Sequence, residues 1–382
     1  MRTICVVSKS TETERVLIVK KKLCFLAVII FILSNTLFVF AEGKQTTIQN
    51  EKKRSIEVKA PNLDGSFPTN PEIAGESPVT GMPWSGKYLP MLVQIDNTSG
   101  GVGSLAQWGV DQADIIYETP LHQGGYMGLT FLYSDTIPDH AGPIRSARIT
   151  QAELREEWDG GFVYYGAQES DGTNVAELFK KTGASQKGVL FSGIVGNSKP
   201  WKKYYTRTAS LPSPHNADAN VKAMQALVPA DFQAYSRPFL FTDELPDYAE
   251  RATNIFIQQK NADYSSSFAY DSSKNVYLRS VHGEPYVDRY TQVQPAFANL
   301  IIQRTTLTFY NNNGAQPVTV NIGSGNADIF VGGRYIPGCW IRTGMNQRTV
   351  FFDQDGNELK LQRGKTFISI LDESVPVSYT GD

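Results

Sequence analysis

The sequence predicts an α+β fold, in which an N-terminal mixed α/β domain is followed by a C-terminal domain of mainly antiparallel β-strands. Three observations support this prediction. The chain has 382 residues, a length that favours two domains over one. Strand-like and helix-like segments alternate between residues 90 and 181. From residue 254 onward, short apolar runs are separated by turn residues, which is typical of antiparallel sheets.

The N-terminal elements follow from apolar periodicity. Strands are expected at residues 90–95, 114–118, 126–133 and 161–165. A helix is expected from Arg145 to Trp158, because this segment follows Gly142-Pro143 and carries an apolar face. A shorter helix is predicted at residues 174–181, and an Ala-rich helix at residues 217–227.

The C-terminal elements are short strands bounded by turn residues. They are expected at residues 254–257, 276–279, 300–303, 305–309, 328–331, 349–352, 359–361 and 366–371. The chain is expected to cross between the two domains within residues 229–247. Cys339, beside Trp340 in an apolar context, is expected to be a small buried residue.

The N-terminus has the features of a secretory signal. Lys20, Lys21 and Lys22 precede an apolar run at residues 23–41, which ends in Ala41 before Glu42. The run is also nearly long enough to be an uncleaved membrane anchor, and both interpretations place the rest of the chain outside the cytoplasm. We find no cysteine at the end of the run that could carry a lipid anchor. The predicted organisation is therefore a signal peptide or membrane anchor at residues 1–41, a polar linker at 42–76, and domains at 77–245 and 250–376.

Composition excludes several classes of protein. The formal net charge is −2, which gives no reason to expect a nucleic-acid partner. Removing residues 1–41 takes away six of the 36 basic and two of the 38 acidic residues, so the remaining 341 residues carry a net charge of −6. Only Cys339 then remains, and the four histidines form no zinc-binding pair. We therefore expect no metal and no cofactor.

Several segments together resemble a known family. They include the motif at residues 77–83, the Val93-Gln94-Ile95-Asp96-Asn97 run, the Gly142-Pro143-Ile144-Arg145-Ser146-Ala147-Arg148 run, Pro214-His215-Asn216 and Gly338-Cys339-Trp340. The chain in this respect resembles the YerB-like bacterial cell-envelope proteins, a family of unknown biochemical function with paired N-terminal and C-terminal domains. The resemblance covers about residues 77–376 and implies an envelope protein.

Polar residues at the ends of predicted strands form the candidate site. Ligands in open α/β sheets bind at the carboxyl ends of the strands, where Asp96 and Asn97 are expected. These two residues could equally form an Asx turn that caps the strand. His215 could act as a general base or bond to a backbone carbonyl. The complete candidate ligand-binding set is Asp96, Asn97, Glu118, Arg145, Arg148, His215 and Asn216.

Two arginines in this set have an unusual expected position. Arg145 and Arg148 are three residues apart in the first turn of the predicted helix, where cations oppose the helix dipole. A bound phosphate, sulfate or carboxylate would compensate for this charge. The alternative is an internal ion pair with Asp96, Asp114 or Glu118.

Three functional hypotheses remain open from the sequence. The first is an exported cell-envelope protein that binds an anionic or glycan-derived ligand in a polar cleft of the N-terminal domain. The second is an envelope hydrolase that uses an Asp/Glu–His pair, for instance Asp96 with His215. The third is a non-catalytic scaffold for protein interaction. The expected partner is an envelope component or a protein, and the membrane itself if the N-terminal segment is not cleaved.

Overall fold

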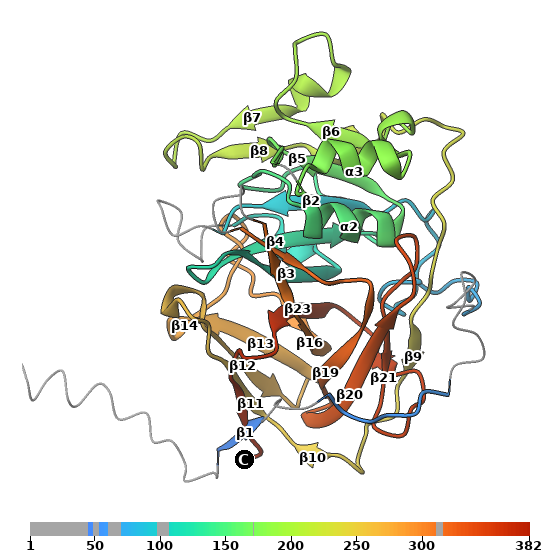
Figure 1. Ribbon diagram of the computed structural model, residues 1–382, viewed down its shortest axis with the longest axis vertical. Coiled ribbons are helices and arrows are strands. Elements are labelled where there is room, and N and C mark those ends of the chain that lie inside the picture. Colours follow the sequence, from blue (N-terminus) through green and yellow to red (C-terminus); the bar gives the residue numbers. More distant parts are fainter. Residues whose placement is uncertain (1–44, 49–52, 60–69, 98–106, 171, 311–315) are drawn as a thin grey trace, which may run out of the picture. The chain divides into compact units, whose positions relative to one another are not determined.

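A computed structural model describes residues 45–48, 53–59, 70–97, 107–170, 172–310 and 316–382. These residues belong to one compact unit. Most of the regular structure is β-strand, and the helices are few and short (Figure 1). The predicted signal or anchor at residues 1–41 lies outside the described residues. No helix in the described part of the chain is long and apolar enough to cross a membrane.

The larger sheet has eleven strands and contains strands from both halves of the chain. Its order is β10-β20-β19-β16-β23-β3-β4-β2-β5-β6, with β21 paired to β20. The C-terminal strand β23 lies between β16 and β3 and is parallel to both. The N-terminal members are β2 (Met91–Ile95), β3 (Ile115–His122), β4 (Tyr126–Tyr133), β5 (Gly161–Tyr164) and β6 (Leu190–Ser192), and the C-terminal members are β10 (Glu250–Arg251), β16 (Asn299–Thr305), β19 (Gly323–Val331), β20 (Arg334–Arg342), β21 (Val350–Phe352) and β23 (Thr366–Asp372).

The second sheet has seven strands, in the order β1-β24-β11-β12-β13-β14, with β15 paired to β13. Its pairings are all antiparallel, as predicted for the C-terminal domain. Its strands are β1 (Thr46–Ile48), β11 (Asn254–Ile257), β12 (Ser266–Asp271), β13 (Val276–Val281), β14 (Glu284–Pro285), β15 (Ala296–Phe297) and β24 (Val377–Thr380). Three two-stranded sheets join β17 (Leu307–Phe309) to β18 (Pro317–Thr319), β22 (Lys360–Gln362) to β9 (Leu240–Thr242), and β7 (Tyr205–Arg207) to β8 (Ala217–Ala219).

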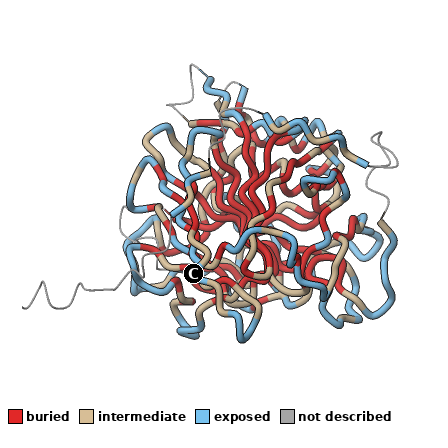
Figure 2. Tube along the Cα trace, turned by 90° about the horizontal axis from the view of Figure 1, so that it is seen from below, coloured by how far each residue is buried: buried red, intermediate tan, exposed pale blue. Residues whose placement is uncertain are grey.

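The core follows the strands of the large sheet. β2, β16 and β3 up to Thr119 are buried on both faces, and the exposed residues are mainly in the peripheral loops (Figure 2). Among the described residues, the core has two large clusters and one small one. One large cluster includes Val93, Phe131 and Phe367, and the second includes Leu92, Trp158 and Trp340. Burial on both faces explains why these strands read as nearly continuous apolar runs in the sequence.

The helices are α2 (Ile149–Trp158), α3 (Val175–Lys181) and α4 (Val221–Gln225), with short 3-10 turns η1 (Val110–Gln112), η2 (Ala184–Gln186), η3 (Pro200–Tyr204) and η4 (Ala262–Tyr264). The chain is therefore mostly β. The two-domain α+β description holds in outline, but the N-terminal domain is not clearly mixed α/β. Parallel strands flank α3, whereas β2, β4 and β3 are joined in antiparallel pairs.

Two predicted helix starts are wrong. Residues 145–148 are extended, because the N–H groups of Arg145 and Ala147 donate to the carbonyls of Gln94 and Gly166 instead of remaining free for a helix. Helix α2 begins only after Arg148, whose N–H donates to the side chain of Gln151. Residues 217–219 form β8 rather than the start of an Ala-rich helix, which is reduced to α4 after Asn220.

The described parts of the predicted polar linker are attached to the compact unit. Strand β1 pairs with β24, and the Lys59 N–H donates to the carbonyl of Gly356. The Arg54 guanidinium forms an ion pair of 2.6 Å with the fully buried Asp328, which also binds Arg304 at 2.8 Å. Burial raises the pKa of Asp328, but the two guanidiniums outweigh it and hold that pKa below its usual value. We name residues 45–48 and 53–59 the N-terminal strap.

Candidate functional site

Asp96 is at the centre of the candidate site. It follows the last residue of β2, and its N–H donates to the carbonyl of Pro143 at 2.7 Å. The side chain is fully buried, and one carboxylate oxygen, Oδ2, lies 2.6 Å from His215 Nδ1 and 3.3 Å from Arg145 Nε. Strand β2 thus delivers a buried carboxylate to a histidine 119 positions later in the chain.

His215 is positioned by the loop between β7 and β8. Its own N–H donates to the carbonyl of Pro212. The neighbouring Asn216 organises the loop, because its side-chain amide donates to the carbonyls of Thr208 and Leu211 at 3.1 and 3.2 Å. Asn216 also accepts a 2.7 Å hydrogen bond from Arg207. Asn216 therefore holds the loop that carries His215.

The two arginines differ in their partners. Arg145 shares Asp96 with His215, and its side chain is 34% exposed. Among the described residues, Arg148 has no carboxylate within ion-pair distance; its side chain donates only to the carbonyl of Ala147, at 3.2 Å, and its buried Nε has no partner. Burial, and then the charge of Arg145, lower the pKa of Arg148. The Asp96 carboxylate thus contacts the Arg145 guanidinium and the His215 imidazole.

Asn97 lies beside Asp96 but points into a different contact. Its side-chain oxygen accepts a 3.1 Å hydrogen bond from Gln107, which also donates to the Asp96 carbonyl at 2.9 Å. The Asn97 amide nitrogen is buried without a partner among the described residues. Asp96 therefore contacts two other predicted site residues, whereas the Asn97 side chain binds Gln107. The ligand-site and Asx-turn interpretations of this pair both stay predictions.

Glu118 is not part of this group. Its carboxylate forms a 2.7 Å ion pair with Arg279 and accepts a 2.8 Å hydrogen bond from Ser369. The structure therefore joins Asp96, Arg145 and His215 directly, with Arg148, Asn97 and Asn216 beside them, and places Glu118 in a separate buried contact. The sequence could not separate these positions, because Glu118 and Asp96 both follow apolar strand residues.

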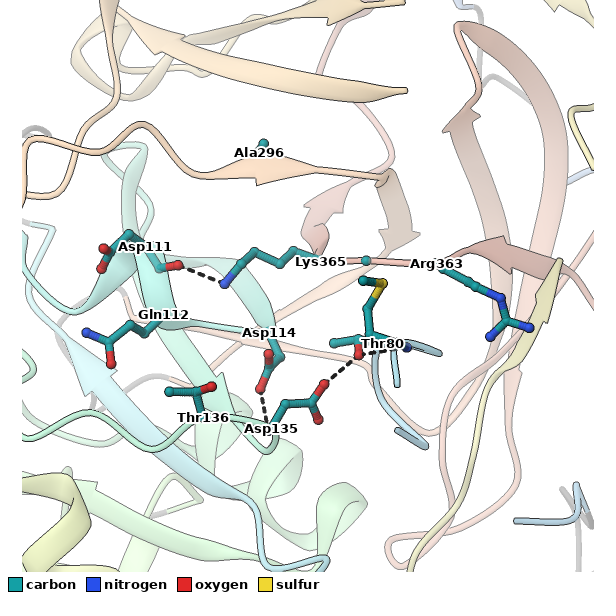
Figure 3. Close-up of a pocket in the computed structure, with 11 residues that line it drawn as sticks. Thr80, Asp111, Gln112, Asp114, Asp135, Thr136, Ala296, Arg363 and Lys365 are labelled. Carbon is teal, nitrogen blue, oxygen red and sulfur yellow. Dashed lines mark hydrogen bonds between the residues drawn. The ribbon is translucent and has the colours of Figure 1, made fainter. Parts of the chain in front are cut away.

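A cavity of about 440 Å³ lies elsewhere, where residues of both domains meet. None of the seven predicted site residues lines it. The Lys365 ammonium donates to the carbonyls of Asp111 and Ala113, both at 2.8 Å, and the carboxylates of Asp114 and Asp135 lie nearby (Figure 3). Other residues that line the cavity are Thr80, Gln112, Thr136, Ala296 and Arg363.

Among the described residues, three carboxylates (Asp111, Asp114 and Asp135) and two basic side chains (Arg363 and Lys365) line this cavity. Burial, together with the charge of Asp135, raises the pKa of Asp114 to about 7, although the N–H groups of Ser134 and Asp135 donate to its carboxylate. Burial also lowers the pKa of Lys365. This cavity was not predicted from the sequence, because Asp114 and Lys365 lie about 250 positions apart and are brought together only by the pairing of β3 with β23.

The side chains in the described part of the chain that could bind a metal ion are those of His, Cys, Asp and Glu. No group of three or more His, Cys, Asp or Glu side chains there has the arrangement of a metal site. Cys339 is a buried free thiol, 7% exposed, as the sequence predicted.

Comparison with known proteins identifies the family. Residues 79–233 match the model described as "Protein of unknown function (DUF3048) N-terminal domain", and residues 254–368 match the corresponding C-terminal domain. The chain belongs to the YerB-like family. The resemblance inferred from the sequence motifs is thereby confirmed, together with the pairing of an N-terminal and a C-terminal domain.

Two individual similarities agree with this assignment. The chain is 25% identical over 308 residues to "Putative lipoprotein YerB" of Bacillus subtilis (strain 168), covering 78% of this chain and 86% of the relative. The crystal structure of the YerB protein from Bacillus subtilis superposes with a TM-score of 0.66 at 22% identity, covering 80% of this chain and 99% of that one. The structural similarity supports the fold of this YerB-like protein.

Proposed function

We propose that this YerB-like protein is located outside the cytoplasm and binds an anionic group of a cell-envelope component through Arg145, Arg148 and His215. Two observations support the location: the basic and apolar segments at the N-terminus, and a relative whose printed name describes a lipoprotein. The ligand itself is inferred from the charges of the site.

One observation carries the proposal: the guanidinium of Arg148 has no carboxylate within ion-pair distance among the described residues. A half-buried cation next to a second cation is unfavourable unless an anion compensates for it. Asp96 already contacts Arg145 and His215, so it does not supply that anion to Arg148. The start of α2, a ten-residue helix, follows immediately and favours negative charge at the same place. A bound phosphate or carboxylate group would neutralise the Arg148 charge and would interact favourably with the start of α2.

The experiment is a titration with inorganic phosphate and with muropeptide and teichoic-acid fragments, followed by calorimetry and by thermal shift. In Arg148→Gln, we expect the affinity for the anionic compounds to fall roughly 10- to 100-fold, since a charge-assisted hydrogen bond contributes about 1.5–3 kcal/mol. The matched control is Arg251→Gln, which removes an exposed guanidinium on β10. Equal losses in both variants, or binding by neither variant nor the wild type, would favour the interaction scaffold instead.

A second candidate function rests on the Asp96–His215 contact. A carboxylate that bonds to Nδ1 orients the ring and stabilises its protonated form, which is how histidine general bases are supported in hydrolases. The 2.6 Å separation satisfies that geometry. This candidate requires turnover of an envelope polymer or ester that is lost in both Asp96→Asn and His215→Gln. Binding without any product in the wild-type protein would exclude it.

A further inference from the structure

A forty-residue stretch contains no acidic residue. Between Glu177 and Asp218, the chain has seven Lys and Arg and no Asp or Glu, whereas the whole chain has a net charge of −2. The stretch includes β6, η3 and β7, which are grouped at one end of the ribbon in Figure 1. Positive charge is therefore concentrated in one part of an acidic protein.

The cations in part of this stretch pack against tyrosine rings. Lys202 and Arg207 lie over the Tyr165 ring, at 5.4 and 5.0 Å from its centroid, and Lys203 lies over Tyr204 at 5.1 Å. We call these five residues the basic–aromatic surface: Tyr165, Lys202, Lys203, Tyr204 and Arg207. Ring contacts hold long cationic side chains in defined positions, which lowers the entropy lost when a ligand orders them.

Within the described residues, these cations have no acidic partner. None of Lys202, Lys203 and Arg207 has a carboxylate within 4.0 Å among the residues that the structure describes, whereas Lys187 in the same stretch pairs with Asp159 at 3.1 Å. The positive charges of Arg207 and Lys202 also act on the hydroxyl of Tyr165. Burial raises the pKa of its hydroxyl, but hydrogen bonds and charges from Arg207 and Lys202 outweigh that effect and lower it.

The basic–aromatic surface is continuous with the proposed anion site. The Tyr165 N–H donates to the carbonyl of Arg145 at 2.8 Å. On the other side, Arg207 donates to Asn216, the residue next to His215. A chain of anionic groups could therefore contact Lys202 and Arg207 and continue to Arg148.

We propose that the basic–aromatic surface binds a linear polyanion in which phosphate groups alternate with uncharged units, and that one phosphate occupies the site at Arg145 and Arg148. The proposal rests on the proposed function. A flexible polymer can reach the half-buried Arg148, which a flat anionic membrane surface cannot. Cations already cover a face of Tyr165 and of Tyr204, which disfavours the stacking of nucleic-acid bases on those faces.

The test measures binding of fluorescently labelled poly(glycerol phosphate) by anisotropy, and of inorganic phosphate by calorimetry. The test variant is Lys202→Gln/Lys203→Gln, which keeps Arg207 and its hydrogen bond to Asn216 in place. Its control is Lys87→Gln/Lys274→Gln, which removes two exposed lysines elsewhere. Two cations near the anionic polymer are lost, so the test variant should bind the polymer roughly 30-fold more weakly. Its salt dependence should also be shallower, and its phosphate affinity should be unchanged.

The outcomes separate this proposal from the anion site. Unchanged polymer binding in the test variant, or an equal loss in the control, overturns the proposal. Tighter binding to phosphatidylglycerol vesicles or to oligothymidylate than to the polymer also overturns it. In another outcome, Arg148→Gln leaves the affinity for both ligands unchanged while the test variant no longer binds the polymer. That result would support the basic–aromatic surface and contradict the anion site. Matching thermal unfolding midpoints establish that each variant is folded.

Discussion

Glu118 on β3 and Arg279 on β13 form an ion pair of 2.7 Å in which both side chains are almost completely buried. The pair connects the two sheets and the two domains. Ser369 donates to the second carboxylate oxygen of Glu118, and the Arg279 guanidinium lies over the rings of Tyr286 and Phe367 at 4.7 and 4.9 Å. Burial raises the pKa of Glu118, and Arg279 opposes that shift.

Glu118→Gln should destabilise the protein by about 3–5 kcal/mol, because it leaves the Arg279 charge buried without a counterion. Urea unfolding followed by tryptophan fluorescence measures the change. Glu118→Gln combined with Arg279→Met should recover part of the loss, since no buried charge then remains. Glu284→Gln, at an exposed position on β14, is the control and should change the stability by less than about 0.5 kcal/mol. A Glu118→Gln protein as stable as this control would contradict the prediction.

Asp114 should make the folded state less stable as the pH rises. The pKa of Asp114 is about 7 in the folded protein, whereas the ordinary pKa of an aspartate is 3.8. The folded state therefore binds the proton more tightly than the unfolded state does. The stabilisation is fully present below about pH 4 and is lost as the pH rises to about 7, by up to roughly 1.4 kcal/mol per pH unit.

The measurement is urea unfolding of the wild type and of Asp114→Asn at each pH from 4 to 8. The amide cannot ionise, so Asp114→Asn should be more stable than the wild type at pH 8, relative to the difference between them at pH 4. Asp231→Asn, at an exposed position, should follow the wild-type curve. Parallel curves for wild type and Asp114→Asn would show that Asp114 does not carry this pH dependence.

Arg54→Ala should lower the free energy of unfolding by about 1–3 kcal/mol, because it removes one of the two guanidiniums that neutralise the buried Asp328. Differential scanning calorimetry provides the comparison. Lys53→Ala removes only an exposed hydrogen bond to Ser324 and should have almost no effect. If the two variants have the same unfolding temperature, the N-terminal strap contributes nothing to stability through Arg54.

Cys339 should be unreactive in the folded protein. It is 7% exposed, and burial raises the pKa of its thiol, so little thiolate is present at neutral pH. The assay uses a chain with Cys5→Ser and Cys24→Ser, so that Cys339 is the only thiol. We expect dithionitrobenzoate to label Cys339 slowly in buffer and rapidly in about 8 M urea, which unfolds the protein. Equal labelling rates in both conditions would contradict the burial of this side chain.

The sequence predicted most strands well because their apolar runs are local signals. Residues 126–133 and 254–257 form strands with the expected bounds. Long-range pairing was not predictable in the same way. No strand was expected at residues 334–342, where Pro337 and Gly338 are unfavourable in a strand interior, yet β20 pairs along its whole length with β19. Gln45 to Ile48 read as linker because their partner, β24, is at the other end of the chain.

The candidate site was predicted in part. Asp96, Arg145 and His215 do lie together, and the signal was a set of polar residues at strand and loop ends. The assumed helical spacing of Arg145 and Arg148 was wrong, because the N–H groups of this segment bind neighbouring strand and loop carbonyls. Lys365 was missed altogether, since a single lysine in a polar loop carries no pattern until β23 places it beside Asp111 and Ala113.

The position of β23 has a consequence for the order of events during synthesis. Glu118 and Ser369, on neighbouring strands, are 251 positions apart. A ribosome therefore releases the whole N-terminal domain while the edge of β3 still lacks its neighbour. Until β23 is synthesised, that edge can pair with other chains, and the Glu118 carboxylate lacks its hydrogen bond from Ser369. A truncation before residue 366 should therefore yield an aggregating product rather than a smaller stable protein.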